Sequence, residues 1–566
     1  MQHDNMVVET ANDAPLATRV KPPASLTLLS AAVAATACGG GSGSGGAAPT
    51  PPPPAPTFTS AEASRLLAQA SFGASRVEIE RVRALGVNGW LDEQLAMPRG
   101  QTHVEWLRAQ GFEAATFVNS RAPLDYSIWR KFLSSPDQLR QRMVYALSQI
   151  MVIAVEGISG RWPAFGAAYY LDLLEANAFG NFRNLLEAVT LSPAMGNYLS
   201  MRGSRKADTS GRQPDENYAR EVMQLFTIGL VELNADGTPQ LAGGATVDSY
   251  GQPDVTGLAR VFTGWDYSTA AIDTPVSVVT PLVNIASRHE AGAKSFLGTT
   301  VAAGTSAAES LRIALDTLFN HPNTGSFISR QLIQRFITSN PSAAYVGRVA
   351  AAFANNGSGV RGDLQAVLRA LLSDAEARDV SAARTVAGAG KLREPVLRFT
   401  QWARAAKVGS LSGQWRLGNL SDPATRLGQS PLHSASVFNF YRPGYVPPNT
   451  AIATASKVAP EFQITTESSV AGYLNFMQTA IATTNGVQGS DVRPDYTAWL
   501  ALAGDAAALA NEANLVLASD QLDITRVALI RDAIAAMPAA TATDQQRRVQ
   551  AALLLTLAAP DYLALK

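Results

Sequence analysis

The spacing of apolar residues constrains the fold of this chain more than any other feature. From Thr59 to the C-terminus, apolar side chains recur every three or four residues, and runs in which they alternate with polar residues are few. A period of about 3.6 residues is that of an amphipathic helix, whereas a period of 2 is that of a strand. Residues 58–566 are therefore predicted to form a large all-α body of many helices, in one or two lobes.

Residues 214–229 carry the densest helical pattern. Pro214 suits the first turn of a helix, and Asp215 and Glu216 place negative charge near its N-terminus. Gly229 favours a left-handed cap at its end. The apolar face consists of Tyr218, Val222, Leu225 and Phe226, and the polar stripe beside it of Asn217, Arg220, Glu221 and Gln224. We expect this helix to have one face in the core and one available for function.

Further helices are predicted wherever the same period continues between turn residues. They span residues 61–71 with Ser60 as the cap, 124–133, 137–154, 162–177, 181–191, 254–264, 308–319, 325–338, 343–353, 362–372, 392–406, 466–483, 496–503, 523–535 and 545–557. One short β-hairpin is predicted near residues 230–241, because Asp236 and Gly237 stand between two short apolar runs and favour a tight turn. Irregular loops connect these elements.

The first 38 residues have the order of an export segment. A basic stretch precedes an apolar run over residues 26–37, and Cys38 follows. Residues 35–38, Ala-Thr-Ala-Cys, resemble a bacterial lipobox, in which the cysteine sulfur carries lipid. Ala35 and Ala37 also fit an ordinary secretory cleavage site, which would release the protein instead. Lipidation at Cys38 is the predicted outcome, and simple secretion is the alternative.

Residues 39–57 are predicted to form a linker, because they are rich first in glycine and serine and then in proline. A polyproline II helix extends ~3.1 Å per residue, so the proline part alone would span about 30 Å. We therefore expect an outer-membrane or cell-surface lipoprotein whose lipid anchor binds the membrane and whose body is held away from it. A periplasmic or secreted protein is the alternative.

The composition excludes several classes of protein. Lys plus Arg and Asp plus Glu both number 46, so the formal net charge is zero and no global field favours nucleic acid. Cys38 is the only cysteine, which excludes an internal disulfide framework and a thiolate metal cluster. No window approaches the ~20 consecutive apolar residues of a membrane span.

Six stretches of the body, taken in order, match the motifs of one family. They are residues 216–221 (Glu-Asn-Tyr-Ala-Arg-Glu), 254–265 (Asp-Val-x-x-Leu-Ala-Arg-x-Phe-Thr-Gly-Trp), 289–298 (His-x-x-Gly-x-Lys-x-x-Leu-Gly), 321–333 (His-Pro-Asn-Thr-Gly-x-Phe-Ile-x-Arg-x-Leu-Ile), 391–395 (Lys-Leu-Arg-Glu-Pro) and 427–443 (Leu-Gly-Gln-x-Pro to Phe-Asn-Phe-Tyr-Arg-Pro). By these motifs the chain resembles the bacterial domain-of-unknown-function family 1800 (DUF1800). Glu290 stands where an aspartate is usual, and Ala68 where a histidine is expected.

The resemblance implies export, a large helical body and the frequent company of a secreted protein of the sulfatase-like or phosphatase-like class. It assigns no reaction and no cofactor. From the residues themselves, the candidate catalytic groups are Glu216, Glu221 and His289, and the candidate metal ligands are His289 and His321, because imidazole and carboxylate suit zinc, iron or manganese. Neither histidine stands in a recognisable metal motif, and a hydrogen-bonded structural role is the competing interpretation.

Charged and amide side chains in the same motifs are candidates for ligand binding. They are Asn217, Arg220, Asp254, Arg260, Lys294, Arg330, Arg393 and Glu394. One hypothesis joins them with Glu221 in a buried polar network around an anionic or polar ligand. The plainer interpretation of Glu216 and Arg220 is a surface pair at i, i+4, which stabilises a helix by only ~0.3–0.5 kcal/mol.

These observations predict an exported envelope protein that acts as a binding or assembly partner of another secreted protein. The alternative is a hydrolase that acts on an envelope or extracellular polymer through a carboxylate and histidine site. The two hypotheses differ at Glu221 and His289, whose substitution would abolish turnover only in the hydrolase.

Overall fold

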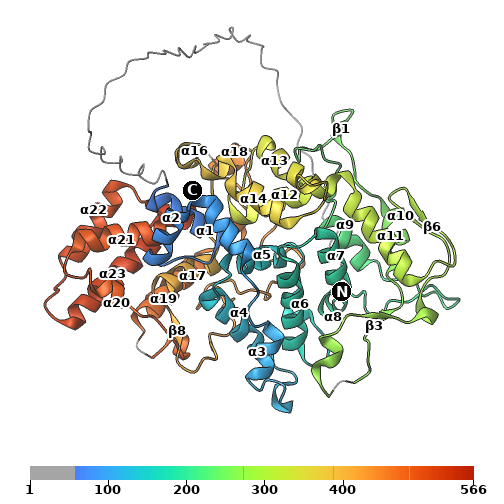
Figure 1. Cartoon of the computed structure of the whole chain (residues 1–566), viewed down its shortest axis with the longest axis horizontal. Coiled ribbons are helices and arrows are strands. Elements are labelled where there is room, and N and C mark those ends of the chain that lie inside the picture. The colour runs from blue at the N-terminus through green and yellow to red at the C-terminus, as the bar shows by residue number, and fades with distance from the viewer. Residues whose placement is uncertain (1–57, 272, 387, 484) are drawn as a thin grey trace, which may run out of the picture. The chain divides into compact units, whose positions relative to one another are not determined.

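Helices dominate the chain from Phe58 onward (Figure 1). The computed structural model describes residues 58–566 except 272, 387 and 484. Within them the fold is mostly α, with only short two-stranded antiparallel sheets, as the apolar period predicts. The predicted export segment 1–38, Cys38 included, and the linker 39–57 lie outside the described residues.

The helices begin at capping residues that the sequence supplies. In the first part of the body they are α1 (Ser60–Ala70), α2 (Arg76–Ala96), α3 (His103–Ala109), α4 (Ala122–Ser134), α5 (Gln138–Ser148), α6 (Pro163–Asn177), α7 (Phe182–Thr190) and α8 (Pro193–Tyr198). Thr59, not Ser60, caps α1: its side chain accepts from the backbone N–H of Glu62, whose carboxylate accepts from Thr59 in return. The same reciprocal pair, Ser75 with Glu78, begins α2.

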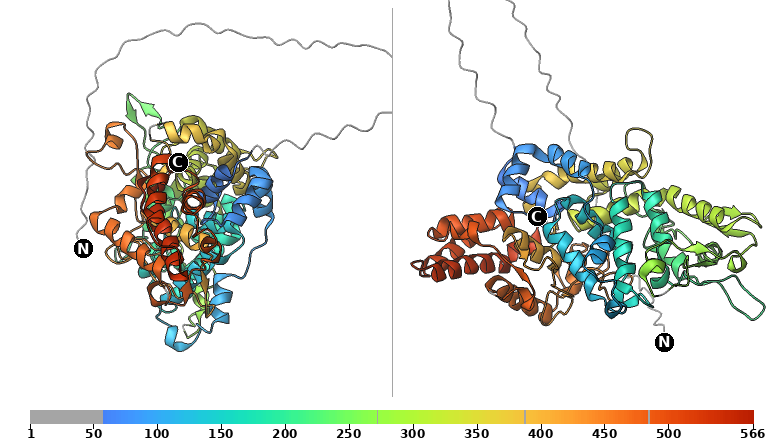
Figure 2. Two further views of the ribbon diagram at one scale, coloured as in Figure 1. Left: turned by 90° about the vertical axis from the view of Figure 1, so that its left-hand side faces the viewer. Right: turned by 60° about the horizontal axis from the view of Figure 1, so that its bottom comes forward.

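The middle and last parts of the body continue this pattern. Their helices are α9 (Asn217–Gln224), α10 (Gln252–Val261), α11 (Ala307–Asn320), α12 (Pro322–Phe336), α13 (Ala343–Ala354), α14 (Leu364–Ser373), α15 (Ala375–Arg378), α16 (Val380–Thr385), α17 (Pro395–Ala405), α18 (Ala451–Thr454), α19 (Glu467–Ala482), α20 (Thr497–Leu500), α21 (Ala506–Ala518), α22 (Ile524–Ala535), α23 (Ala542–Ala558) and α24 (Pro560–Leu563). Helices α21 to α23 lie at one end of the body and α9 to α11 at the other (Figures 1 and 2).

The predicted organising helix is shorter than residues 214–229. Helix α9 begins after Glu216 and ends at Gln224, where the chain turns: the N–H groups of Ile228 and Gly229 both donate to the carbonyl of Met223. Gly229 has a φ of 75°, the left-handed conformation that its position predicts. The apolar face is buried at Tyr218, Val222 and Phe226 as predicted, but Glu221, expected in the exposed stripe, is buried with them.

Strand pairing is more extensive than the single hairpin predicted near residues 230–241. A turn does form there, since Leu233 and Pro239 make an isolated bridge around Asp236 and Gly237. The paired strands of the described residues are β1 (Leu241–Ala242) with β2 (Ala245–Thr246), β3 (Trp265–Asp266) with β4 (Val283–Asn284), β5 (Lys294–Phe296) with β6 (Thr299–Val301), β7 (Lys391–Leu392) with β10 (Ala564–Leu565), and β8 (Gly409–Ser410) with β9 (Val492–Arg493). The β7–β10 pair joins the C-terminal segment to the centre of the chain.

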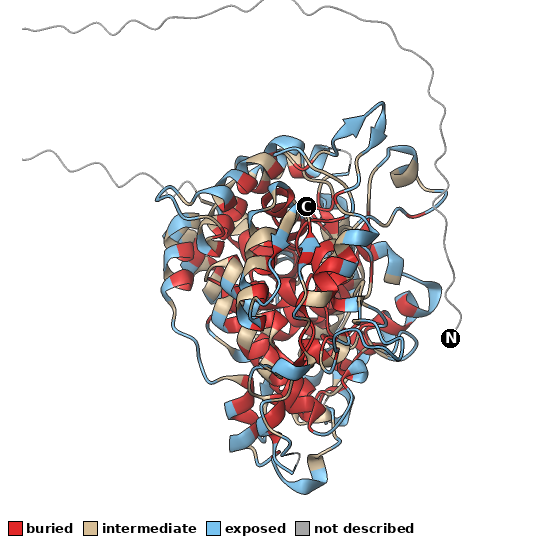
Figure 3. Cartoon of the chain, turned by 90° about the vertical axis from the view of Figure 1, so that its right-hand side faces the viewer, coloured by how far each residue is buried: buried red, intermediate tan, exposed pale blue. Residues whose placement is uncertain are grey.

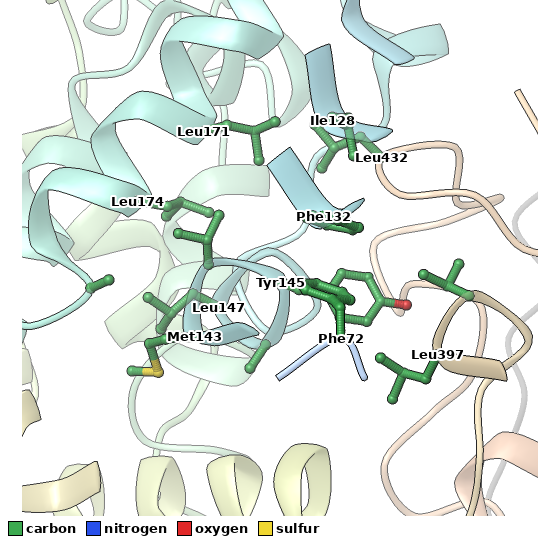
Figure 4. Close-up of a cluster of buried hydrophobic side chains, with 14 of the residues drawn as sticks. Phe72, Ile128, Phe132, Met143, Tyr145, Leu147, Leu171, Leu174, Leu397 and Leu432 are labelled. Atoms are coloured by element: carbon green, nitrogen blue, oxygen red, sulfur yellow. The ribbon is translucent and has the colours of Figure 1, made fainter. Parts of the chain in front are cut away.

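The hydrophobic core runs through the whole body, and one part of it gathers aromatic and aliphatic side chains of α4, α5, α6 and α17 with Phe72 and Leu432 (Figure 4). Phe72 and Phe132 stack with ring centroids 3.9 Å apart, and Tyr145 lies tilted against them at 5.8 and 5.6 Å. Such pairs add about 0.5–1.5 kcal/mol each beyond the apolar area that they bury. The hydroxyl of Tyr145 leaves this cluster and reaches a buried carboxylate, which leads to the candidate site.

Buried residues fill the interior and exposed ones its rim (Figure 3). No helix within the described residues has both the length and the hydropathy of a membrane span.

Candidate functional site

The surface of α9 carries Glu216 and Arg220 as an i, i+4 ion pair with an N···O distance of 3.4 Å. The Glu216 carboxylate also accepts hydrogen bonds from Gln252 and Thr256 of α10, at 2.8 Å each. Asn217 beside it is exposed. These contacts tie two helices together at the surface, which is the plainer of the two interpretations of this motif.

Asp254 holds the next motif together. Its carboxylate accepts from the N–H of Gly251 at the start of α10, at 2.8 Å, and from the N–H of Leu297 in the β5–β6 turn, at 2.7 Å. Arg260 at the end of α10 pairs with Glu290 at 3.6 Å. Asp254 and Arg260 therefore anchor the 289–298 motif to α10.

Lys294 and Arg330 also have local partners. The ammonium of Lys294 is fully buried and lies 3.4 Å from the Ser310 hydroxyl, and burial lowers the pKa of Lys294. Arg330 donates to the carbonyl of Gly237 at 3.4 Å. Neither contacts Arg393 or Glu394, so the structure does not form the single network that the sequence hypothesis joins.

Glu221 and His289 are the candidate acid and base of the sequence hypothesis, and both are buried. Burial raises the pKa of Glu221 against the attraction of Arg220. Nδ1 of His289 lies 3.0 Å from the carbonyl oxygen of Thr263 and therefore carries the proton, since a carbonyl only accepts. Burial lowers the pKa of His289, so its ring is neutral at pH 7. Each residue keeps one buried side-chain atom without a hydrogen-bond partner among the described residues: Oε2 of Glu221 and Nε2 of His289.

His321, the other predicted metal ligand, caps α12. Its Nδ1 accepts from the backbone N–H of Asn323 at 3.2 Å, and its Nε2 lies 3.9 Å from Glu232. Neither His289 nor His321 belongs to a group of three or more potential ligands in the part of the chain that the structure describes.

One such group is present there, and the sequence did not single it out. His103, Asp172 and Glu175 place one ligand atom each within 4.8 Å of one another. Asp172 accepts from the N–H groups of His103 and Val104 and so caps α3. Both oxygens of Glu175 accept from the ammonium of Lys131, at 2.6 and 2.7 Å. Because Lys131 already supplies the positive charge, this group fits a buried ion pair better than a metal site.

The densest buried polar cluster surrounds Glu394, the N-cap residue of α17. We call it the Glu394 centre, and it consists of Tyr145, Gln149, Lys391, Glu394, Gln429 and Glu461. Oε2 of Glu394 accepts from the Tyr145 hydroxyl at 2.8 Å, from Gln149 at 2.5 Å and from Gln429 at 2.7 Å. These three donors come from distant parts of the chain, α5 and its end and the 427–443 motif, so the centre locks them together.

Lys391 is the cation of the centre. Its ammonium lies 2.9 Å from Glu461 and 3.6 Å from Glu394, and it donates to the carbonyls of Gln334 and Arg335 at 3.0 Å each. Burial opposes ionisation of Glu394, but attraction by Lys391 and its other partners outweighs burial and lowers the pKa of Glu394 to about 2. The carboxylate is therefore charged at any physiological pH. A permanently charged carboxylate whose Oε2 accepts three hydrogen bonds suits structural organisation and not proton transfer.

A second cluster joins the buried side chains of Asp125 and His433 to Glu156, which is exposed. Nε2 of His433 lies 2.7 Å from Asp125 and Nδ1 lies 2.5 Å from Glu156. Burial alone would lower the pKa of His433 and raise that of Asp125, and the ion pairs oppose both effects. The short contacts favour the charged pair, and the pKa of His433 rises to about 9. The sequence offered little signal for this cluster, because its members lie up to 308 residues apart.

Two adjoining hollows open beside the Glu394 centre, and we call them the paired hollows. Their volumes are about 380 and 350 Å³. Both are lined by Asn340, Lys457 and residues 388–390. The second is also lined by Lys391 and by Phe462, which stands next to Glu461 in the 3-10 helix Pro460–Ile464. The segment with Lys391 and the 3-10 helix with Glu461 and Phe462 therefore contribute both to the Glu394 centre and to the lining of the second hollow.

The paired hollows expose apolar side chains together with main-chain polar groups. Val386 is 57% exposed in the first, and Phe462 is 37% exposed in the second. Asn340 fixes one wall, because its side chain accepts from the N–H of Val458 and donates to the Val458 carbonyl, at 2.9 Å each. Hollows of about 300–1,000 Å³ with mainly apolar linings are typical of binding sites.

Comparison with known proteins gives one match. The family described as "Protein of unknown function (DUF1800)" matches residues 65–564 of the chain. Neither a curated protein nor a solved structure matches it. Since the match covers nearly all of the described residues and includes all six motifs, the chain belongs to the DUF1800 family.

Proposed function

We propose that this protein is an exported component of the cell envelope, anchored by lipid at Cys38, and that its body binds another exported protein through the paired hollows. The order of basic stretch, apolar run, Cys38 and linker supports the anchor. The exposed apolar side chains of the hollows support the binding role.

The observation that carries the binding role is the exposure of Val386 and Phe462 at the mouths of hollows large enough for side chains of a partner. Apolar groups exposed together in a concave surface lose contact with water when a partner covers them. Burying one large apolar side chain contributes about 1.5–3 kcal/mol, so covering Val386 and Phe462 contributes at most about 3–6 kcal/mol toward association.

The candidate catalytic groups favour binding over hydrolysis. Glu216 is occupied by Arg220, Gln252 and Thr256 at the surface. Glu221 and His289, whose Nδ1 lies against the Thr263 carbonyl, are joined by no hydrogen bond or ion pair in the described structure. Two carboxylates that cleave a glycosidic bond must face each other across the substrate, ~5–9.5 Å apart. Glu376 is the only carboxylate among the described residues that line the paired hollows.

The partner that we propose is a secreted protein of the sulfatase-like or phosphatase-like class. The test uses Ala389, which lines both hollows and is partly exposed. Ala389→Arg places a long charged side chain in them, whereas Ala533→Arg makes the same change on the exposed side of α22 and is the matched control. We expect a co-expressed partner of that class to purify with the wild type and with Ala533→Arg but not with Ala389→Arg, at equal melting temperatures. Equal recovery with both variants would contradict the proposal.

The anchor is tested separately by metabolic labelling with a radioactive fatty acid. The wild type should carry the label and fractionate with membranes, and Cys38→Ser should do neither. An unlabelled wild-type protein in the soluble fraction would favour simple secretion.

The alternative is a hydrolase of an envelope or extracellular polymer. Its support is the neutral ring of His289, whose Nε2 has no partner among the described residues and could accept a proton. His289→Asn and Glu221→Gln would abolish polymer cleavage in that case while leaving partner recovery intact. Loss of partner recovery in Ala389→Arg without any cleavage activity in the wild type supports binding.

A further inference from the structure

Lys391, which lines the second of the paired hollows, also lines a small cavity that we call the arginine cavity. It lies where the residues that follow α1 meet α5, β7 and the start of α17. It has about 10 Å³ of space for the centre of a water-sized sphere, which is room for one small particle. Its charged lining consists of Arg142, Lys391 and Arg393, with no carboxylate among the described residues that line it.

The two guanidinium groups have N–H donors that are not used elsewhere in the described structure. Arg142 and Arg393 are 1% and 3% exposed. Arg142 donates from Nη2 to the carbonyl of Arg335 at 2.5 Å, and its Nε and Nη1 have no partner. Arg393 donates from Nη1 to the carbonyl of Leu517 at 3.3 Å, and its Nε and Nη2 have no partner. Buried donors are almost always satisfied, so these four N–H groups call for an acceptor.

The surrounding core has more positive than negative charge. Its buried cations are Arg142, Arg335, Lys391, Arg393 and Arg398, and its buried carboxylates are Glu394 and Glu461. Both carboxylates face the ammonium of Lys391. Arg142 is also attracted by Glu394, whereas Arg393 faces the carbonyl of Leu517 and the ring of Tyr562, which lies 4.7 Å away. An arginine keeps its charge when buried, so the five cations of this part of the core outnumber its two carboxylates.

We propose that the arginine cavity binds one small anion of chloride size, held by the free N–H groups of Arg142 and Arg393. A monatomic halide supplies the missing negative charge and accepts N–H groups from any direction. A tetrahedral oxyanion such as phosphate exceeds the space available. A water molecule fits the space but supplies only two acceptor sites and no charge. The anion holds α5 to the start of α17 beside the Glu394 centre.

The first test is crystallographic and uses bromide as the probe. Crystals of the full-length protein grown without halide are soaked in sodium bromide, and data are collected at the bromine absorption edge. The expected result is an anomalous peak between Arg142 and Arg393. Bromide peaks confined to the protein surface would overturn the proposal.

The second test measures melting temperature in sodium bromide and in sodium gluconate at equal ionic strength. A ligand at 100 times its dissociation constant shifts the melting temperature of a chain of this length by about 2–3 °C. Bromide should raise the melting temperature of the wild type by this amount relative to gluconate, and an equal melting temperature in both salts would contradict the site.

Variants locate the effect. Arg142→Met should lose the difference between bromide and gluconate. Arg140→Met is the matched control on the same helix, because Arg140 is buried but pairs with Asp137 at 3.4 Å and should keep the difference. Ala68→Leu fills the cavity without changing any charge and should also lose it, which provides a second variant if Arg142→Met does not fold.

Discussion

The Glu394 centre makes a quantitative prediction for Glu394→Gln. The amide keeps the size of the side chain and removes its charge. The change leaves Lys391 with one carboxylate instead of two. The new N–H₂ group faces the Lys391 ammonium if it replaces Oε1, and the donors of Tyr145, Gln149 and Gln429 if it replaces Oε2. We expect a large loss of stability with the fold retained, because the apolar cluster around Tyr145 is untouched.

The magnitude follows from the structure in two ways. A pKa lowered from 4.5 to about 2 corresponds to roughly 3 kcal/mol of interaction that favours the charged form in the folded state. Removing one member of a buried ion pair costs about 3–5 kcal/mol in other proteins. Both routes give a loss of about 3–5 kcal/mol in the free energy of unfolding at pH 7.

The assay is urea denaturation followed by circular dichroism, with Glu216→Gln as the matched control. Glu216 pairs with Arg220 at the surface, so that control should lose no more than about 0.5 kcal/mol. The sign of the pH dependence is a second check. Because the folded pKa of Glu394 lies below its unfolded value, its contribution is complete above pH 4.5 and falls as the pH approaches about 2. A Glu394→Gln variant as stable as Glu216→Gln, or an advantage of the wild type that grows at low pH, would refute the reasoning.

Three further predictions concern the other buried clusters. The pKa of His433 is raised to about 9, so the stability that protonated His433 contributes, up to about 3 kcal/mol, is complete below pH 6.5 and is lost as the pH rises through 9. The difference in urea midpoint between the wild type and His433→Gln should therefore shrink from pH 6 to pH 9.5. A constant difference would argue against the ion pair with Asp125. Lys131→Met should destabilise the protein by about 3–5 kcal/mol, because it leaves Glu175 as an unpaired buried charge. Adding Glu175→Leu should restore most of this stability, as measured by calorimetry. A double variant no more stable than Lys131→Met would show that the loss does not come from an unpaired charge. Zinc or a chelator should leave the melting temperature unchanged, because the carboxylates near His103 already have partners; a rise with zinc that His103→Asn abolishes would assign a metal to this group.

The helical architecture could be predicted from the sequence because helix formation depends on local signals. The predicted helix 343–353 is α13, Ala343–Ala354, whose N-cap Ser342 accepts from the N–H of Tyr345. The predicted helix 137–154 ends early at Ser148, where the N–H groups of Gln149 and Ile150 donate to the carbonyls three residues back, at Ala146 and Leu147, and tighten the last turn. Helix α21 was missed, since alanines make up much of its buried face and weaken the apolar pattern.

The candidate site could be predicted only in part. Arg393 and Glu394 were singled out from their motif, and both are central to the structure. Their partners could not be predicted, because Tyr145 and Glu394 are 249 residues apart and no local pattern indicates that contact. Glu221 on α9 and His289 in a loop have side chains that can transfer protons. Which side chains they face depends on tertiary packing, which the sequence pattern does not indicate.

Site-specific photocrosslinking tests the central proposal, binding of an exported partner through the paired hollows, most directly. A photoreactive phenylalanine replaces Phe462 in the second hollow, and in a second variant it replaces Leu529, which is 62% exposed on α22 and lies outside both hollows. Irradiation of cells that express each variant should give one defined adduct with an exported sulfatase-like or phosphatase-like protein at position 462, and none at position 529. No adduct at position 462, or the same adducts at both positions, would contradict the account.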